Sequence, residues 1–137
     1  MTKLETLEQE AFDKNINIYY RDMSLDGFCI KDNVCINKGL SNLKKYWVLV
    51  HELEHLELNA LYTIDSSTRS VAYYERKVND SIIKKYKLDE LLVKSFQYGI
   101  DKWELCNDYD IPFELYDATI NYLYRKGVLL WKTELYF

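Results

Sequence analysis

The stretch His51-Glu52-Leu53-Glu54-His55 contains the only two histidines of the chain. On a helix, residues four apart lie on one face, one turn above the other. Two imidazoles at this spacing can hold one Zn2+ from adjacent turns, and a glutamate next to the first can act as general base toward a water at the metal. The pattern predicts a helix here, with His51 and His55 as metal ligands and Glu52 as the base.

The apolar residues around this stretch indicate which side of the helix is buried. Trp47, Val50, His51 and Leu58 fall on one helical stripe, with His55 beside them. Both histidines are therefore expected to face inward. A pair of hydrogen-bonded core histidines without a metal is the alternative interpretation of the same pattern.

A catalytic zinc usually has three protein ligands, and here a carboxylate must supply the third because no histidine remains. The helix expected from residue 70 to 87 carries one charged residue, Glu75, in a stripe that is otherwise apolar or aromatic. A buried carboxylate is unfavourable unless it is paired or bound to a metal, so Glu75 is predicted to be the third ligand. The alternative is a Glu75 tilted to the edge of the stripe and paired with Arg76 or Lys77.

Other polar residues are weaker candidates for the site. Asn79, one turn further along the same helix, is predicted to orient the third ligand, with an exposed helix asparagine as the alternative. Tyr74 is the candidate phenol for transition-state stabilisation, although Tyr62 and Tyr73 are also close in sequence. Glu54 points off the face that the histidines share, and we expect it to be solvated.

Hydrophobic spacing predicts the other elements. The first part of the chain should contain a helix over 4–14, a strand over 16–20 and a β-hairpin around the turn Lys31-Asp32-Asn33. Ser41 can cap a long helix that reaches about Leu61. Beyond a polar loop at 63–70, helices are expected over 70–87, over 89–106 with a break near Gly99, and from Pro112 to about Gly127. The tail, 128–137, is expected to be a strand or an extended segment.

We therefore expect an α+β fold: a mainly helical, zincin-like single domain with a small antiparallel sheet and two helices that carry the metal ligands. The 137 residues suffice for one compact domain and are few for two. We expect residues 1–137 to form this domain, with a catalytic core at 1–87 and a C-terminal helical part at 88–137.

Composition narrows the classes of partner. The formal net charge is −4 and no basic face is clustered, which disfavours nucleic acid as a direct partner. No apolar run reaches the roughly 18 residues that a membrane span requires. The three cysteines show no CxxC spacing, so free thiols in the cytoplasm are expected. Cys29 and Cys35 could face each other across the predicted hairpin.

Together these motifs resemble the ImmA/IrrE family of small metallopeptidases, especially the short versions of phages and integrating elements. The resemblance covers most of the chain and rests on five segments: Val34 to Asn37, Tyr46 to His55, Glu75 to Asn79, Tyr98 to Leu105, and Tyr109 to Pro112. Glu54 stands where the family commonly has glycine, and Val78 where it commonly has alanine. Neither departure is at a predicted ligand. The expected effect of Glu54 is a narrower cleft or added negative charge near the metal, which would change substrate preference and not metal binding.

The resemblance implies a gluzincin-type site, with His51, His55 and Glu75 on zinc and Glu52 as base. It also implies a substrate, the helix-turn-helix repressor of the same mobile element, cut to derepress its genes. The alternative function is a non-catalytic regulator that binds a repressor or another partner through the same surface. A DNA-binding role is less favoured, because the chain is acidic and has no basic recognition helix.

Overall fold

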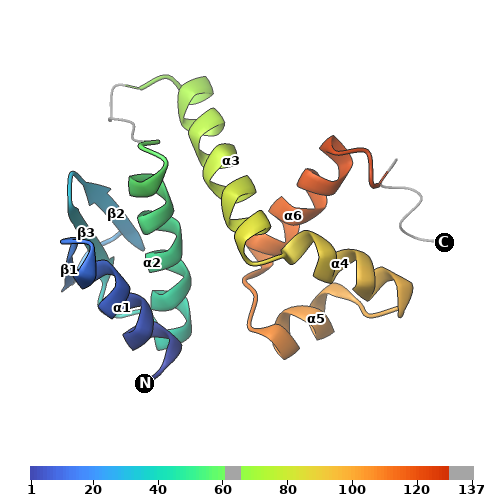
Figure 1. Cartoon of the computed structure of the whole chain (residues 1–137), viewed down its shortest axis with the longest axis horizontal. Coiled ribbons are helices and arrows are strands. Elements are labelled where there is room, and N and C mark those ends of the chain that lie inside the picture. The colour runs from blue at the N-terminus through green and yellow to red at the C-terminus, as the bar shows by residue number, and fades with distance from the viewer. Residues whose placement is uncertain (61–65, 130–137) are drawn as a thin grey trace. The chain divides into compact units, whose positions relative to one another are not determined.

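The computed structural model describes residues 1–60 and 66–129, which form six helices and a three-stranded sheet (Figure 1). The fold is α+β, as the sequence predicts. The chain divides into two compact units, Met1–Val78 and Asn79–Phe137. The partition that the sequence suggested within one domain, at residues 87 and 88, stays a prediction. Among the described residues, no helix is both long enough and apolar enough to cross a membrane.

The first unit packs two helices, α1 (Lys3–Asp13) and α2 (Asn42–Glu57), against one face of the sheet (Figure 1). Burial alternates along β1 (Asn17–Arg21), β2 (Gly27–Ile30) and β3 (Asn33–Asn37), so every second side chain faces the helices. At the centre of this layer, Val34, Ile36 and Leu49 are fully buried. This core fixes the distance between α2 and the sheet.

The sheet is mixed, whereas the sequence predicted an antiparallel one. β2 and β3 form the predicted hairpin, but β1 pairs with the other edge of β3 and runs parallel to it. The chain reverses direction between β1 and β2 and again in the hairpin turn, so β1 and β3 run the same way. The resulting order, β1-β3-β2, leaves β2 at an edge of the sheet.

The hairpin register separates two of the cysteines. Cys29 pairs with Val34 and lies on the face that packs against the helices, whereas Cys35 pairs with Phe28 on the opposite face. Successive residues of a strand point to opposite faces, and Cys35 follows Val34 directly. The suggestion that these two cysteines face each other across the hairpin is therefore wrong.

A Schellman motif ends α2 before the predicted position near Leu61. Asn59 has a left-handed backbone with φ of 51°. The N–H of Ala60 donates to the carbonyl of His55, and the N–H of Asn59 donates to the carbonyl of Leu56. These two bonds satisfy carbonyls in the last turn of the helix and turn the chain away from its axis.

The starts of the two ligand-bearing helices follow their capping residues. The Ser41 hydroxyl accepts from the N–H of Lys44 at 3.2 Å, as the sequence predicts for α2. α3 (Thr68–Lys85) begins two residues before the predicted Ser70, and the Ser67 hydroxyl accepts from the N–H of Ser70 at 3.1 Å. The predicted loop at 63–70 and the predicted tail at 128–137 lie partly outside the described residues.

In the second unit, α4 (Leu88–Gln97) and α5 (Lys102–Tyr109) both pack on α6 (Phe113–Arg125). Gly99, with φ of 68°, separates α4 from α5 where the sequence predicts a break. Pro112 is the N-cap of α6, in agreement with its predicted role at the start of that helix. Arg125 holds Asp80 through two hydrogen bonds of 2.9 and 2.6 Å, which ties the end of α6 to α3.

Candidate metal centre

Helix geometry brings the two histidines together. His51 and His55 lie one turn apart on α2, and their Nε2 atoms are 3.1 Å from each other. His55 is buried, whereas 28% of the His51 side chain is exposed. The two rings therefore present nitrogen atoms to one point that solvent can reach from the His51 side.

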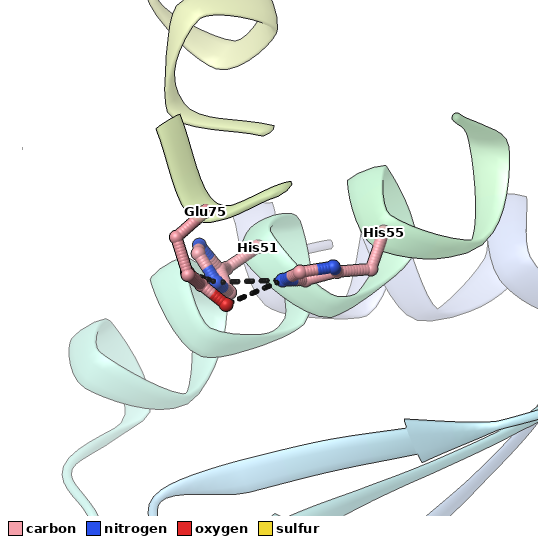
Figure 2. Close-up of side chains that lie close together, drawn as sticks. All are labelled: His51, His55 and Glu75. Atoms are coloured by element: carbon pink, nitrogen blue, oxygen red, sulfur yellow. Dashed lines mark hydrogen bonds and ion pairs between the residues drawn. The ribbon is translucent and has the colours of Figure 1, made fainter. Parts of the chain in front are cut away.

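Glu75, from α3, completes the cluster (Figure 2). Its Oε2 atom lies 2.9 Å from Nε2 of His51, and its Oε1 atom lies 3.0 Å from Nε2 of His55. About two thirds of the Glu75 side chain is buried, since 32% is exposed. The structure thus brings together, from two consecutive helices, the three residues that the sequence predicted as ligands.

The cluster has the size and the chemistry of a metal site. His51, His55 and Glu75 offer ligand atoms that all lie within 4.8 Å of one another, and no other such group was found among the described residues. In a tetrahedral zinc site with bonds of about 2.1 Å, ligand atoms are about 3.4 Å apart. The observed separations of 2.9–3.1 Å would have to open only slightly. Two imidazole nitrogens and one carboxylate are also a known donor set of catalytic zinc.

A backbone carbonyl determines which nitrogen of His55 faces the cluster. The Nδ1 atom of His55 lies 2.7 Å from the carbonyl oxygen of Ala60. A carbonyl can only accept, so Nδ1 carries the hydrogen and Nε2 of the neutral ring keeps its lone pair, directed at Glu75 and His51. A lone pair facing a carboxylate is unfavourable unless a proton or a metal cation lies between them. The Schellman motif positions Ala60, so the end of α2 is part of the site.

The same contacts change the pKa of His55. Burial by itself lowers this pKa, but hydrogen bonds to Glu75 and to the Ala60 carbonyl, with the charges of Glu75 and Glu52, outweigh burial and raise it. The surroundings of His55 therefore favour positive charge at this point. A metal cation would supply positive charge at the same point as the proton does.

Glu52 is buried beside the cluster without belonging to it. Only 9% of Glu52 is exposed. Burial raises its pKa, and electrostatic interactions with His51, the Cys29 thiol and His55 offset this rise only in part. A carboxyl group with a raised pKa, next to a metal site, has the properties of a general base.

Glu54 does not lie where the sequence predicted. It is 4% exposed, so the expectation that it is solvated is wrong. That expectation assumed one apolar stripe on the helix, whereas α2 contacts α1, β2 and β3 and is buried over more of its circumference.

The remaining candidates lie on α3 or outside the described residues. Tyr74 is half-buried and next to Glu75, and its ring packs against that of Tyr73 at 5.4 Å. Asn79 is half-buried and one turn further along the helix. The roles suggested for Tyr74 and Asn79 stay predictions, and Tyr62 lies outside the described residues.

Three contributors to the site were missed in the sequence. Ala60 acts through its carbonyl, which every residue has, so no side-chain pattern marks it. Asn59 carries a readable signal, because asparagine is one of the residues that favour the left-handed position after a helix. The place of Cys29 beside Glu52 depends on how β2 packs on α2, which no local pattern encodes.

The candidate centre is thus defined by its own geometry: three converging ligand atoms, an oriented imidazole and a buried carboxyl group. The resemblance to ImmA/IrrE metallopeptidases stays a prediction from the motifs. In comparisons with known proteins, no family model, no curated protein and no solved structure matches this chain.

Proposed function

We propose that this chain is a zinc-dependent endopeptidase of the zincin type, acting in the cytoplasm. In this proposal His51, His55 and Glu75 hold the metal and Glu52 is the general base. The observation that carries it is the convergence of both Nε2 atoms and the Glu75 carboxylate at separations of 2.9–3.1 Å. A buried carboxyl group directly after the first histidine adds the base that hydrolysis requires.

Each residue has a separate task in this scheme. Zinc, when bound, supplies Lewis-acid chemistry, which polarises a peptide carbonyl and acidifies water. Glu52 accepts a proton from the attacking water and can pass it to the leaving amine nitrogen. The Ala60 carbonyl holds the His55 ring in one orientation. The exposed parts of His51 and Glu75 leave the centre accessible to a polypeptide.

The substrate in this proposal is a helix-turn-helix repressor of a phage or mobile element. This part rests on the sequence resemblance alone. Its direct test is to incubate the zinc-loaded protein with such a repressor and to look for new N-termini by mass spectrometry. The Glu52→Gln variant should produce none of them, because its side chain cannot accept the proton.

A non-catalytic regulator is the second candidate function, and one observation favours it. The distance of 3.0 Å between His55 Nε2 and Glu75 Oε1 also suits a shared proton, without any metal. The position of Glu52 favours the peptidase, because a purely structural or proton-bridged cluster does not require a buried carboxyl group beside it.

Metal content is the first test of the peptidase proposal. We expect about one zinc per chain in protein purified without added zinc, and little in the His55→Ala and Glu75→Ala variants. Glu10→Ala is the matched control, since Glu10 is an exposed carboxylate on α1 and should leave the zinc content unchanged. If the parent binds no zinc even after incubation with the ion, the peptidase proposal is wrong.

A further inference from the structure

An aromatic pair is exposed where α5 meets α6. Trp103, on α5, is 66% exposed, and Phe113, the first residue of α6, is 39% exposed. Their ring centroids are 5.5 Å apart, so the two rings form one apolar surface across the two helices. Aromatic side chains stabilise a fold mainly by the area that they bury, and this pair leaves much of that area in water. Exposed apolar groups surrounded by polar residues are typical of surfaces that bind other proteins.

The surface around this pair is negatively charged. Lys102 is the only cation between Lys94 and Arg125 in the sequence. Its ammonium group is already paired, because it lies 2.9 Å from Oδ1 of Asp117. The segment 101–117 nevertheless contains six carboxylates: Asp101, Glu104, Asp108, Asp110, Glu114 and Asp117.

Local helix chemistry explains some of these charges but not all of them. Asp101 caps α5, since its carboxylate accepts from the N–H of Glu104 at 2.8 Å. Glu104 and Glu114 lie in the first turns of α5 and α6, where the helix dipole favours negative charge. Asp108 lies in the last turn of α5, where the same dipole disfavours it, and no cation among the described residues pairs with it. Helix stability therefore does not account for Asp108, just as core packing does not account for Trp103.

The aromatic pair and these charges lie on the solvent side of the two helices. α5 buries Leu105 and Cys106, whereas Glu104 and Asp108, one turn apart, are exposed together with Trp103. On α6, the exposed Glu114 directly follows the aromatic residue that contacts Trp103. We call five residues the acidic aromatic patch: Trp103, Phe113, Glu104, Asp108 and Glu114.

We propose that the acidic aromatic patch is a docking surface for an arginine-rich segment of a partner protein. A guanidinium group stacks on an aromatic ring, best on that of tryptophan, and binds a carboxylate through two parallel hydrogen bonds. The patch offers both kinds of group, and its three carboxylates have no cationic partner among the described residues. A lysine ammonium group is a compact and strongly hydrated charge, so it gains less from such a surface.

A repressor that binds DNA carries such a segment, because arginine and lysine side chains contact the phosphates. The choice of a repressor as the partner rests on the proposed function, whereas the docking surface does not. Under both proposals, the peptidase holds its substrate by the basic surface that otherwise contacts DNA.

Binding of a labelled peptide tests the surface without any need for hydrolysis. The probe is fluorescein-labelled nona-arginine, titrated with the full chain and followed by fluorescence anisotropy, with nona-lysine as the matched peptide. We expect Trp103→Ala to raise the Kd for nona-arginine about 5- to 10-fold and to remove the preference over nona-lysine. Because Trp103 is 66% exposed, its midpoint of unfolding in urea should stay unchanged. Phe12→Ala, which removes a 73% exposed ring from α1, is the matched control and should keep the parental Kd.

Charge variants separate the patch from general attraction to an acidic protein. The double variant Glu104→Gln/Asp108→Asn should raise the Kd and reduce its dependence on salt concentration. Glu10→Gln/Asp13→Asn removes two exposed carboxylates from α1 and should have little effect. Equal losses in the two double variants would mean attraction to net charge alone and would overturn the proposal, as would an unchanged Kd in Trp103→Ala.

The two proposals can fail separately. A protein that binds nona-arginine through Trp103 but holds no zinc supports the docking surface and counts against the peptidase. A protein that holds zinc and cleaves a repressor, yet binds nona-arginine no more tightly than nona-lysine, keeps the proposed function and overturns the docking surface.

Discussion

Replacing Asn59 by valine tests whether the end of α2 is part of the metal site. Asn59 has φ of 51°, a region that asparagine tolerates and a β-branched residue does not. We estimate the strain at about 1–2 kcal/mol. Movement of Ala60 relieves this strain but withdraws its carbonyl from Nδ1 of His55, now 2.7 Å away. Loss of such a partner weakens metal binding about 10- to 100-fold, so we expect the zinc affinity of Asn59→Val to fall at least about 10-fold.

Asn15 provides a matched control, because α1 ends in the same way. Asn15 has φ of 62°, and its own N–H and that of Ile16 donate to the carbonyls of Phe12 and Ala11. Asn15→Val should lose a similar free energy of unfolding in urea but keep the parental zinc affinity in competition with a chromophoric chelator. Parental zinc affinity in Asn59→Val would refute the role of the Ala60 carbonyl. An equal loss in both variants would point to general loosening instead.

Two further predictions concern packing and pH. Gly27→Ala should lower the free energy of unfolding by about 1–3 kcal/mol. Its Cβ would lie 2.5 Å from Cγ1 of Val48 and 3.1 Å from the carbonyl oxygen of Cys35, so neighbouring atoms would have to move. An unchanged midpoint of unfolding in urea would contradict the close approach of β2 to α2. In the metal-free protein, the raised pKa of His55 means that the folded state binds this proton more tightly than the unfolded chain does. The resulting stabilisation is fully present below the ordinary pKa of 6.5 and is lost as the pH rises through the raised value. Thermal melting in EDTA should therefore show a difference in Tm between the parent and Glu75→Gln that narrows as the pH rises, and a constant difference would count against this coupling.

The sequence located the elements well where local rules apply. Ser41 and Pro112 predict helix starts because a cap depends on the few residues beside it. The hairpin around Lys31-Asp32-Asn33 follows from alternation and from a turn that tolerates a left-handed residue. The α2 end was missed, although Asn59 carries the local signal, because the apolar pattern continues past it.

The sequence did not predict features that depend on the packing of one element against another. β1 joins the hairpin as a parallel strand, which depends on which edge of β3 is open. Glu54 is buried because α2 is covered on more sides than its own periodicity indicates. Neither feature is recorded in the spacing of residues along one element.

The sequence by itself determined that His51 and His55 share one helix face, with Glu52 next to them, because a spacing of four residues closes one helical turn. It also singled out Glu75 as the charge in an apolar stripe. Only the tertiary structure decided that this carboxylate meets both imidazoles and that a backbone carbonyl orients His55. The first contact joins two helices, which only packing brings together. The second depends on a backbone carbonyl, a group that every residue has and that no side-chain pattern marks.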